Sequence, residues 1–145
     1  MKTFIVDSFT SQPFKGNPAG VCFPAQALPE AQMQSIAMEL GLSETAFVLP
    51  AKESGHYSIR YFSPKKEIPL CGHATLASAS ILFRNAGIQR IHFITVEGVD
   101  LTVERRDDAV AMFFPLYDTS PAEAPAPLLA ALGITTVMDT RWSEK

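Results

Sequence analysis

The 145-residue chain has few charged residues and few cysteines. Charged side chains make up 19% of the sequence, and 12 Lys and Arg residues against 15 Asp and Glu residues give a net charge of −3. Because there is no basic excess to attract a polyanion, nucleic acid is not an expected partner. The two cysteines, Cys22 and Cys71, lie far apart and form no CxxC motif, which argues against a disulfide framework or a structural zinc site and fits a reducing cytoplasm.

Long apolar runs are also missing. The apolar segments are interrupted well before the roughly 18 consecutive residues that a membrane span needs. The N-terminus has no basic stretch followed by an apolar one, so we expect a soluble, unexported cytoplasmic protein. What the chain does have is 47% hydrophobic residues over a length suited to one domain, which is enough for a buried core.

Local patterns predict an α+β fold. A helix is expected from Pro29 to Gly41, where the proline suits the first turn and the glycine suits the C-cap. The glycines, asparagine and proline of Phe14–Gly20 predict a rigid turn before the apolar Val21–Phe23 run. Alternating or β-branched residues predict strands over 3–9, 43–50, 57–61, 90–96, 100–105 and 109–114.

The segment from Gly72 to Gly87 carries apolar or small residues at nearly every position, and its first charge is Arg84. A helix that is apolar all round is buried, and its small side chains allow other backbone to approach closely. Tight turns at Glu97–Gly98 and Asp107–Asp108 then predict an antiparallel meander. The expected architecture is a curved, mostly antiparallel sheet wrapped around one central helix.

The C-terminal part differs in composition. Residues 121–127 are rich in Pro and Ala and are predicted to form a linker, followed by a short helix over 128–132 and apolar residues beyond it. We therefore expect one lobe over 1–120, and over 121–145 a linker with the start of a second lobe that is otherwise absent.

The start of the central helix, Cys71-Gly72-His73-Ala74-Thr75, is a candidate binding site. Unpaired amides and the helix dipole favour a carboxylate there, and Gly72 allows its close approach. The same field should lower the pKa of Cys71, although a small buried cysteine is an equally good interpretation. His73 can donate to an acidic ligand or move a proton near neutral pH.

Glu44 directly precedes an apolar strand, a setting that would desolvate its carboxyl group as a general acid/base requires. A solvent-exposed glutamate at a strand end is the simpler interpretation of the pattern alone. Asn17 could contact a ligand, but asparagine is commonly a turn residue. His56 and His92 have no partner at metal-ligand spacing and are taken as surface or edge residues, so no metal site is expected.

Four motifs occur together in order, and they carry a family resemblance: Asp7-Ser8-Phe9 before Phe14-Lys15-Gly16-Asn17-Pro18-Ala19-Gly20-Val21, Leu42-Ser43-Glu44-Thr45-Ala46-Phe47, Arg60-Tyr61-Phe62-Ser63-Pro64, and Cys71-Gly72-His73-Ala74-Thr75. The chain resembles the PhzF-like (phenazine biosynthesis-like) family of the diaminopimelate epimerase superfamily. The resemblance covers essentially the whole chain, as the N-terminal lobe of a protein with two similar lobes and a cleft between them.

The resemblance implies an isomerase or epimerase that moves a proton on a small carboxylate without a cofactor or metal. Glu44 then corresponds to the acid/base residue, Gly72 and His73 to substrate contacts at the helix start, and Asn17 to a ligand-facing loop residue. With the ability of His73 to move a proton, we expect Glu44 and His73 to be catalytic and Asn17, Gly72 and Cys71 to bind the substrate. In the epimerase relatives a cysteine does this work in each lobe, and in the PhzF-like branch the glutamate replaces it. The second lobe would come from pairing with another chain, such as a homo-oligomer partner.

Two alternatives remain open at this stage. A chain that offers half of a cleft could act as a small-carboxylate binding or assembly module without turnover, because catalysis needs reacting groups on both sides of the substrate. A thiol-dependent hydrolase using Cys71 and His73 is disfavoured, because their closeness in the sequence predicts poor mutual geometry.

Overall fold

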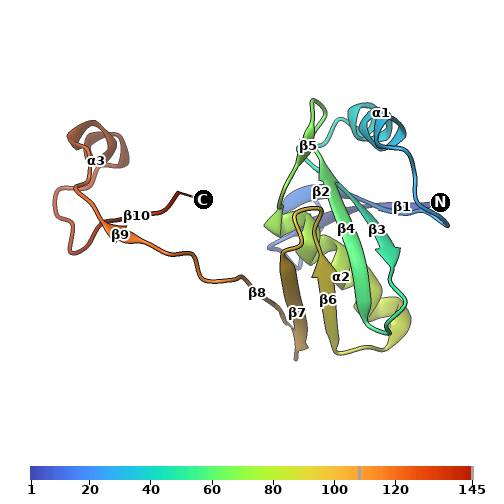
Figure 1. Ribbon diagram of the computed structural model, residues 1–145. Helices are drawn as coiled ribbons and strands as arrows, with labels where there is room; N and C mark the ends of the chain where they lie inside the picture. The colour runs from blue at the N-terminus through green and yellow to red at the C-terminus, as the bar shows by residue number, and fades with distance from the viewer. Residues whose placement is uncertain (108, 145) are drawn as a thin grey trace. The chain divides into compact units, whose positions relative to one another are not determined.

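The computed structural model describes residues 1–107 and 109–144, which form two compact units. The first unit comprises Met1–Phe114 and the second begins at Pro115 (Figure 1). Asp108, half of the predicted Asp107–Asp108 turn, lies outside the described residues, as does Lys145.

The first unit is built on one sheet with the strand order β1-β2-β3-β4-β6-β7-β8, and β5 pairs with β4 beside this path. The pairs β2–β3 and β4–β6 are parallel, and the other pairs are antiparallel. The α+β class and the mostly antiparallel sheet are therefore confirmed. The strands are β1 (Lys2–Ser8), β2 (Asn17–Phe23), β3 (Thr45–Pro50), β4 (His56–Phe62), β5 (Glu67–Ile68), β6 (Arg90–Ile94), β7 (Asp100–Arg106) and β8 (Ala109–Phe113).

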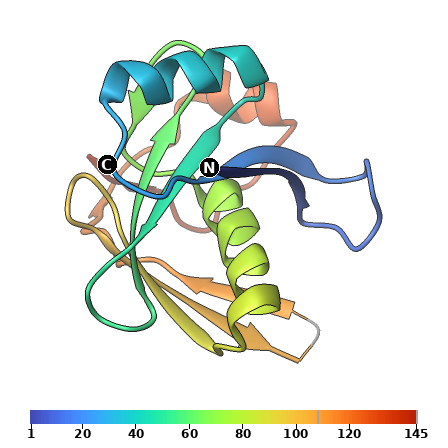
Figure 2. The same cartoon turned by 90° about the vertical axis from the view of Figure 1, so that its right-hand side faces the viewer.

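Two helices cover opposite faces of this sheet (Figure 2). Helix α2 (Gly72–Ala86) packs on the side chains of alternate strand positions, such as Val48, Ile59 and Phe93. The intervening positions, such as Phe47, pack against α1 (Glu30–Leu40) on the other face. This alternation follows from the two-residue period of a strand.

Helix α2 forms the core of the unit because it is enclosed rather than laid on a surface. Ala74 and Ala79 are fully buried, and their small side chains let the sheet curl closely around the helix. Ile59 and Phe93 are also fully buried, and each contributes about 1.5–3 kcal/mol by leaving water. The helix ends as predicted, with Gly87 in the left-handed conformation at its C-cap.

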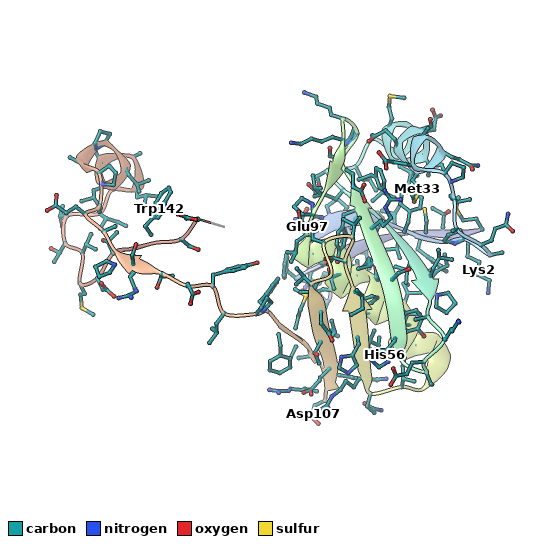
Figure 3. The ribbon with its side chains drawn as sticks, in the orientation of Figure 1. Lys2, Met33, His56, Glu97, Asp107 and Trp142 are labelled. Atoms are coloured by element: carbon teal, nitrogen blue, oxygen red, sulfur yellow. The ribbon has the colours of Figure 1, made fainter. Side chains whose placement is uncertain are left out.

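Helix α1 follows the prediction equally closely. Pro29 precedes its first residue, and Gly41 closes it with φ of 64° and a hydrogen bond from its N–H to the carbonyl of Ala37. Met33, labelled in Figure 3, is buried against Phe47 and Phe62 of the sheet. This second core cluster anchors the connection that leads from α1 to Glu44.

One local expectation is wrong. The segment Asn17–Gly20 is not a turn but the first half of β2, whose register with β1 runs from Lys2↔Phe23 to Ser8↔Asn17. Pro18 is tolerated because β3 pairs only with Gly20–Cys22, so Pro18 has a ladder neighbour on one side only. The turn is confined to the residues before Asn17, where Gly16 lies so close to the Ser8 carbonyl that a Cβ would stand 2.2 Å from its oxygen.

The second unit contains an antiparallel pair of short strands, β9 (Ser120–Pro121) and β10 (Arg141–Trp142), and a helix, α3 (Ala126–Leu132). The helix predicted over 128–132 is present and begins two residues earlier. Leu116 and Met138 are fully exposed, and Trp142, labelled in Figure 3, is 65% exposed. None of the helices in the described part of the chain has the length and apolar character to cross a membrane.

Candidate active site

Strand alternation directs three polar side chains toward the first turn of α2. Ser8 follows Phe4 and Val6 on the face of β1 that packs on α2, and Tyr61 follows Ile59 on the same face of β4. Glu44 lies two residues before Ala46, which also faces α2, so its side chain extends from β3 on that side. Three separate elements therefore meet where the helix begins.

Buried hydrogen bonds fix the backbone of this turn. The Ser8 hydroxyl donates to the carbonyl oxygen of His73 at 2.7 Å. The Thr75 hydroxyl donates to the Cys71 carbonyl at 2.7 Å, and it lies 2.5 Å from the Tyr61 hydroxyl. Because Thr75 has one hydroxyl proton and gives it to Cys71, Tyr61 is the donor to Thr75. Cys71 and His73 are thus held in place from both sides.

The side chains of Glu44, Cys71 and His73 form a compact cluster on this turn. The Nε2 atom of His73 lies 3.4 Å from Oε2 of Glu44, and Nδ1 lies 3.3 Å from the Cys71 Sγ. One ligand-type atom from each residue lies within 4.8 Å of the others. The side chains of Glu44 and His73 are 22% and 10% exposed, and Cys71 is 6% exposed. The cluster is therefore nearly enclosed, and its carboxylate is the most accessible part.

Cys71 does not have the lowered pKa that its place at a helix start suggested. Burial, together with a smaller contribution from the neighbouring Glu44 carboxylate, raises the pKa of its thiol from 9.0 to about 11. The backbone N–H groups of Ala74 and His73 act in the opposite direction, as the helix dipole predicts, but burial outweighs them. Cys71 is consequently a neutral thiol at physiological pH.

His73 has one neighbour at each ring nitrogen. The Cys71 sulfur lies 3.3 Å from Nδ1, and which of the two donates depends on the tautomer of the ring. The Nε2 atom lies 3.4 Å from Oε2 of Glu44, which is an ion-pair distance. Nε2 is buried and makes no hydrogen bond among the described residues, so it is available to a further partner. The imidazole therefore lies between the thiol and the carboxylate.

Two inferences from spacing are therefore corrected. Poor geometry between Cys71 and His73 was expected, yet a contact of 3.3 Å joins them because the extended N-cap conformation of Cys71 turns its side chain toward the first helical turn. Sequence spacing also indicated no cluster of metal-ligand type. The fold creates one by bringing Glu44 to the Cys-x-His pair from 27 residues away along the chain.

The two remaining substrate-binding candidates lie near the cluster. Asn17 is exposed and pairs with Ser8 in the β1–β2 register, and Ser8 is the residue that donates to the His73 carbonyl. A Cβ added to Gly72 would meet the Met112 and Phe114 side chains at 3.4 and 3.5 Å, which is ordinary van der Waals contact. The fold itself therefore does not demand a glycine at position 72.

Other candidates lie away from the cluster. Arg60, the first residue of the third family motif, binds the carboxylate of Glu67 with two nitrogens at 2.7 and 2.6 Å and also contacts Glu30. His56 and His92 are not edge residues, because they stack on each other across the interior pair β4–β6, with ring centroids 4.6 Å apart. The site also includes Ser8, Tyr61 and Thr75, which stand in the family motifs but were not predicted to have a role. Their signal in the sequence was the alternation that places Ser8 and Tyr61 on the core face.

Comparisons with known proteins agree with this picture. The family model for phenazine biosynthesis-like proteins matches residues 6–133. Phenazine biosynthesis-like domain-containing protein 2 of Mus musculus is 42% identical over 151 residues, which cover 97% of this chain and 52% of the mouse protein. A protein of Pseudomonas aeruginosa named as an uncharacterized isomerase is 44% identical over 133 residues, covering 90% of this chain and 50% of that protein.

Among solved structures, a PhzC/PhzF protein from Clostridium difficile superposes with a TM-score of 0.78 at 40% identity, covering 97% of this chain and 54% of that one. The fold and the cluster define an α+β protein with a carboxylate–imidazole pair at the start of an enclosed central helix. The chain belongs to the phenazine biosynthesis-like (PhzF) protein family. It spans about half the length of the curated relatives it matches.

Proposed function

We propose that this chain supplies the acid/base half of a cofactor-independent isomerase that moves a proton on a small carboxylate substrate. The observation that carries the proposal is the 3.4 Å contact between Glu44 and His73 at the N-terminus of α2. Membership of the PhzF family and similarity to a protein named as an isomerase support the same class of reaction.

In this reaction the Glu44 carboxylate takes a proton from one carbon of the substrate. The resulting carboxylic acid then returns the proton to another carbon, so the substrate changes its bonding but not its composition. His73, whose Nε2 lies 3.4 Å from the carboxylate, stabilises the ionised form of Glu44 before the transfer when this nitrogen carries a proton. The substrate carboxylate binds at the helix start, where unpaired amides and the dipole favour negative charge.

Neighbouring residues position this pair. Ser8 fixes the His73 backbone, and Cys71 fixes its imidazole through Nδ1. Cys71 itself is not the base in this proposal, because burial keeps its thiol neutral. Asn17, Gly72 and the Cys71 backbone border the place where the substrate would lie.

The test is incorporation of deuterium from heavy water into a panel of small cyclic and amino-acid-like carboxylates, followed by NMR. We expect exchange with the wild-type chain and a loss of at least about 100-fold in Glu44→Gln, since positioned acid/base groups contribute about 10²–10⁴-fold. Glu39→Gln, at an exposed position of α1, is the matched control and should exchange normally. Equal rates in wild type and Glu44→Gln would remove Glu44 from this role.

The helix start of α2 would equally serve one alternative, a binding or assembly module that retains the carboxylate site without turnover. The same samples separate the two functions. Carboxylate-dependent chemical-shift changes at α2 without any deuterium incorporation support the binding module, whereas incorporation excludes it.

A further inference from the structure

The cluster at the start of α2 contains three kinds of ligand atom in one place. Glu44 offers a carboxylate oxygen, Cys71 a sulfur and His73 a ring nitrogen, and these atoms lie within 4.8 Å of one another. The His73 Nε2 atom is buried and has no hydrogen-bond partner among the described residues beyond its approach to Glu44. Carboxylate, thiolate and imidazole are the three ligand types that zinc takes from proteins.

We propose that Glu44, Cys71 and His73 form a reversible Zn²⁺ site in which the bound ion blocks the acid/base pair. The inhibitory consequence rests on the function proposed above, whereas the binding itself does not. In the metal-bound state Glu44 and His73 are occupied as ligands and cannot exchange protons with a substrate. The fourth zinc position remains for water or another small ligand.

The distances suit a tetrahedral ion after a small adjustment. Zinc bond lengths of about 2.0–2.3 Å place N and O ligands about 3.4 Å apart and N and S ligands about 3.6 Å apart at the tetrahedral angle. Glu44 and His73 are already 3.4 Å apart through Nε2. The sulfur contacts Nδ1 on the opposite side of the ring, so one side chain must move before all three atoms meet a single ion. For an ion at Nε2 that side chain is Cys71, and for an ion at Nδ1 it is Glu44, the more accessible of the two.

Charge also favours the ion. Zinc binding displaces the thiol proton of Cys71, and the resulting thiolate and the Glu44 carboxylate together balance the two positive charges of the metal. A neutral complex avoids most of the penalty for burying charge.

The experiment titrates the full chain with Co²⁺ in place of Zn²⁺, because cobalt reports its ligands by absorption. We expect one equivalent to bind with the near-ultraviolet charge-transfer band of a cobalt–thiolate bond, and Zn²⁺ to displace it. Cys71→Ser should lose that band and bind Zn²⁺ at least about 100-fold more weakly, since even changes to residues behind the ligands cost about 10–100-fold. Cys22→Ser, which alters the other buried cysteine, should keep both properties.

Two further variants make the outcome decisive. Glu44→Gln should weaken Zn²⁺ binding but retain the thiolate band, and it tests the site even if Cys71→Ser fails to fold. His56→Asn removes one ring of the stacked His56–His92 pair, which lies on the opposite face of the sheet from α2. This variant should change neither the thiolate band nor the affinity for Zn²⁺. The proposal is overturned if the wild type shows no thiolate band, if the band survives in Cys71→Ser, or if only His56→Asn reduces binding. None of these readouts uses turnover, so they stand or fail separately from the deuterium-exchange test.

Discussion

The buried pair Tyr61 and Thr75 offers a quantitative test of how the start of α2 is held. Tyr61 donates to the Thr75 hydroxyl, which in turn donates to the carbonyl of Cys71. Thr75 is fully buried and Tyr61 is 1% exposed, so water does not replace either bond. Because Tyr61 donates to Thr75 and Thr75 donates to Cys71, removing the Tyr61 hydroxyl and removing the Thr75 hydroxyl should lower the free energy of unfolding by different amounts.

In Tyr61→Phe, Thr75 keeps its bond to Cys71 and no buried group is orphaned, so the loss is that of one hydrogen bond, about 0.5–1.5 kcal/mol. In Thr75→Val, the Tyr61 hydroxyl is left buried without an acceptor, which costs about 1–3 kcal/mol. The Cys71 carbonyl is not orphaned, because the Thr75 N–H still donates to it at 3.1 Å. Thr75→Val should therefore be the more damaging single change.

The double variant completes the cycle. When Tyr61 is already Phe, Thr75→Val leaves no buried hydroxyl without a hydrogen bond. The double variant should therefore lose less free energy of unfolding than the sum of the losses in the two single variants. Urea unfolding followed by far-ultraviolet circular dichroism gives the three free energies, provided that the m-values agree. Strict additivity, or a larger loss in Tyr61→Phe than in Thr75→Val, would refute the donor order and the argument built on it.

Two further predictions concern packing and pH. Gly16→Ala should lower the free energy of unfolding by about 1–3 kcal/mol, because the new Cβ would overlap the Ser8 carbonyl oxygen. Gly72→Ala is the control, because a Cβ at that position has ordinary contacts. Equal melting temperatures for the two variants would contradict the prediction. The raised pKa of Cys71 should make the protein lose stability from pH 9 to 11, because the unfolded thiol ionises from 9.0 while the folded thiol stays neutral to about 11. Thermal melts of Cys71→Ser should therefore fall less steeply over that range than those of wild type, and parallel curves would argue against a buried neutral thiol.

Most secondary structure could be predicted because its signals are local. The apolar run of α2 and its closing glycine gave both ends of the helix, since burial and C-capping depend on residues within the element itself. The segment Asn17–Gly20 was predicted to be a turn because it contains turn-forming residues. Proline is also tolerated in a strand where no second strand needs its N–H, and Pro18 is such a case because β3 pairs only with Gly20–Cys22. The register of β3 on β2 depends on the tertiary structure, so the local sequence does not reveal it.

The site could be predicted only in part, for the same reason. His73 and Glu44 were identified through motifs, but nothing local places a carboxylate on a helix start 27 residues further along the chain. That meeting requires β3 to lie inside the sheet beside β2 and β4, with its even-numbered residues facing α2. The pKa of Cys71 was misjudged because the helix dipole is visible in the sequence, whereas the degree of burial that outweighs it is not.

The start of α2 shows how the fold keeps this site available. A serine, threonine or aspartate at the N-cap would stabilise the helix by about 1 kcal/mol, but its side chain would occupy an amide of the first turn. Cys71 holds the N-cap position, and the described structure gives it no side-chain capping hydrogen bond. Ser8 and the Tyr61–Thr75 pair fix the turn through its carbonyl oxygens instead, at His73 and Cys71. Because these bonds use carbonyl acceptors, they hold the helix start rigid without taking its N–H donors. The N–H groups of His73 and Ala74 instead interact with the sulfur of Cys71, which is a weaker acceptor than the hydroxyl or carboxylate of an ordinary N-cap residue.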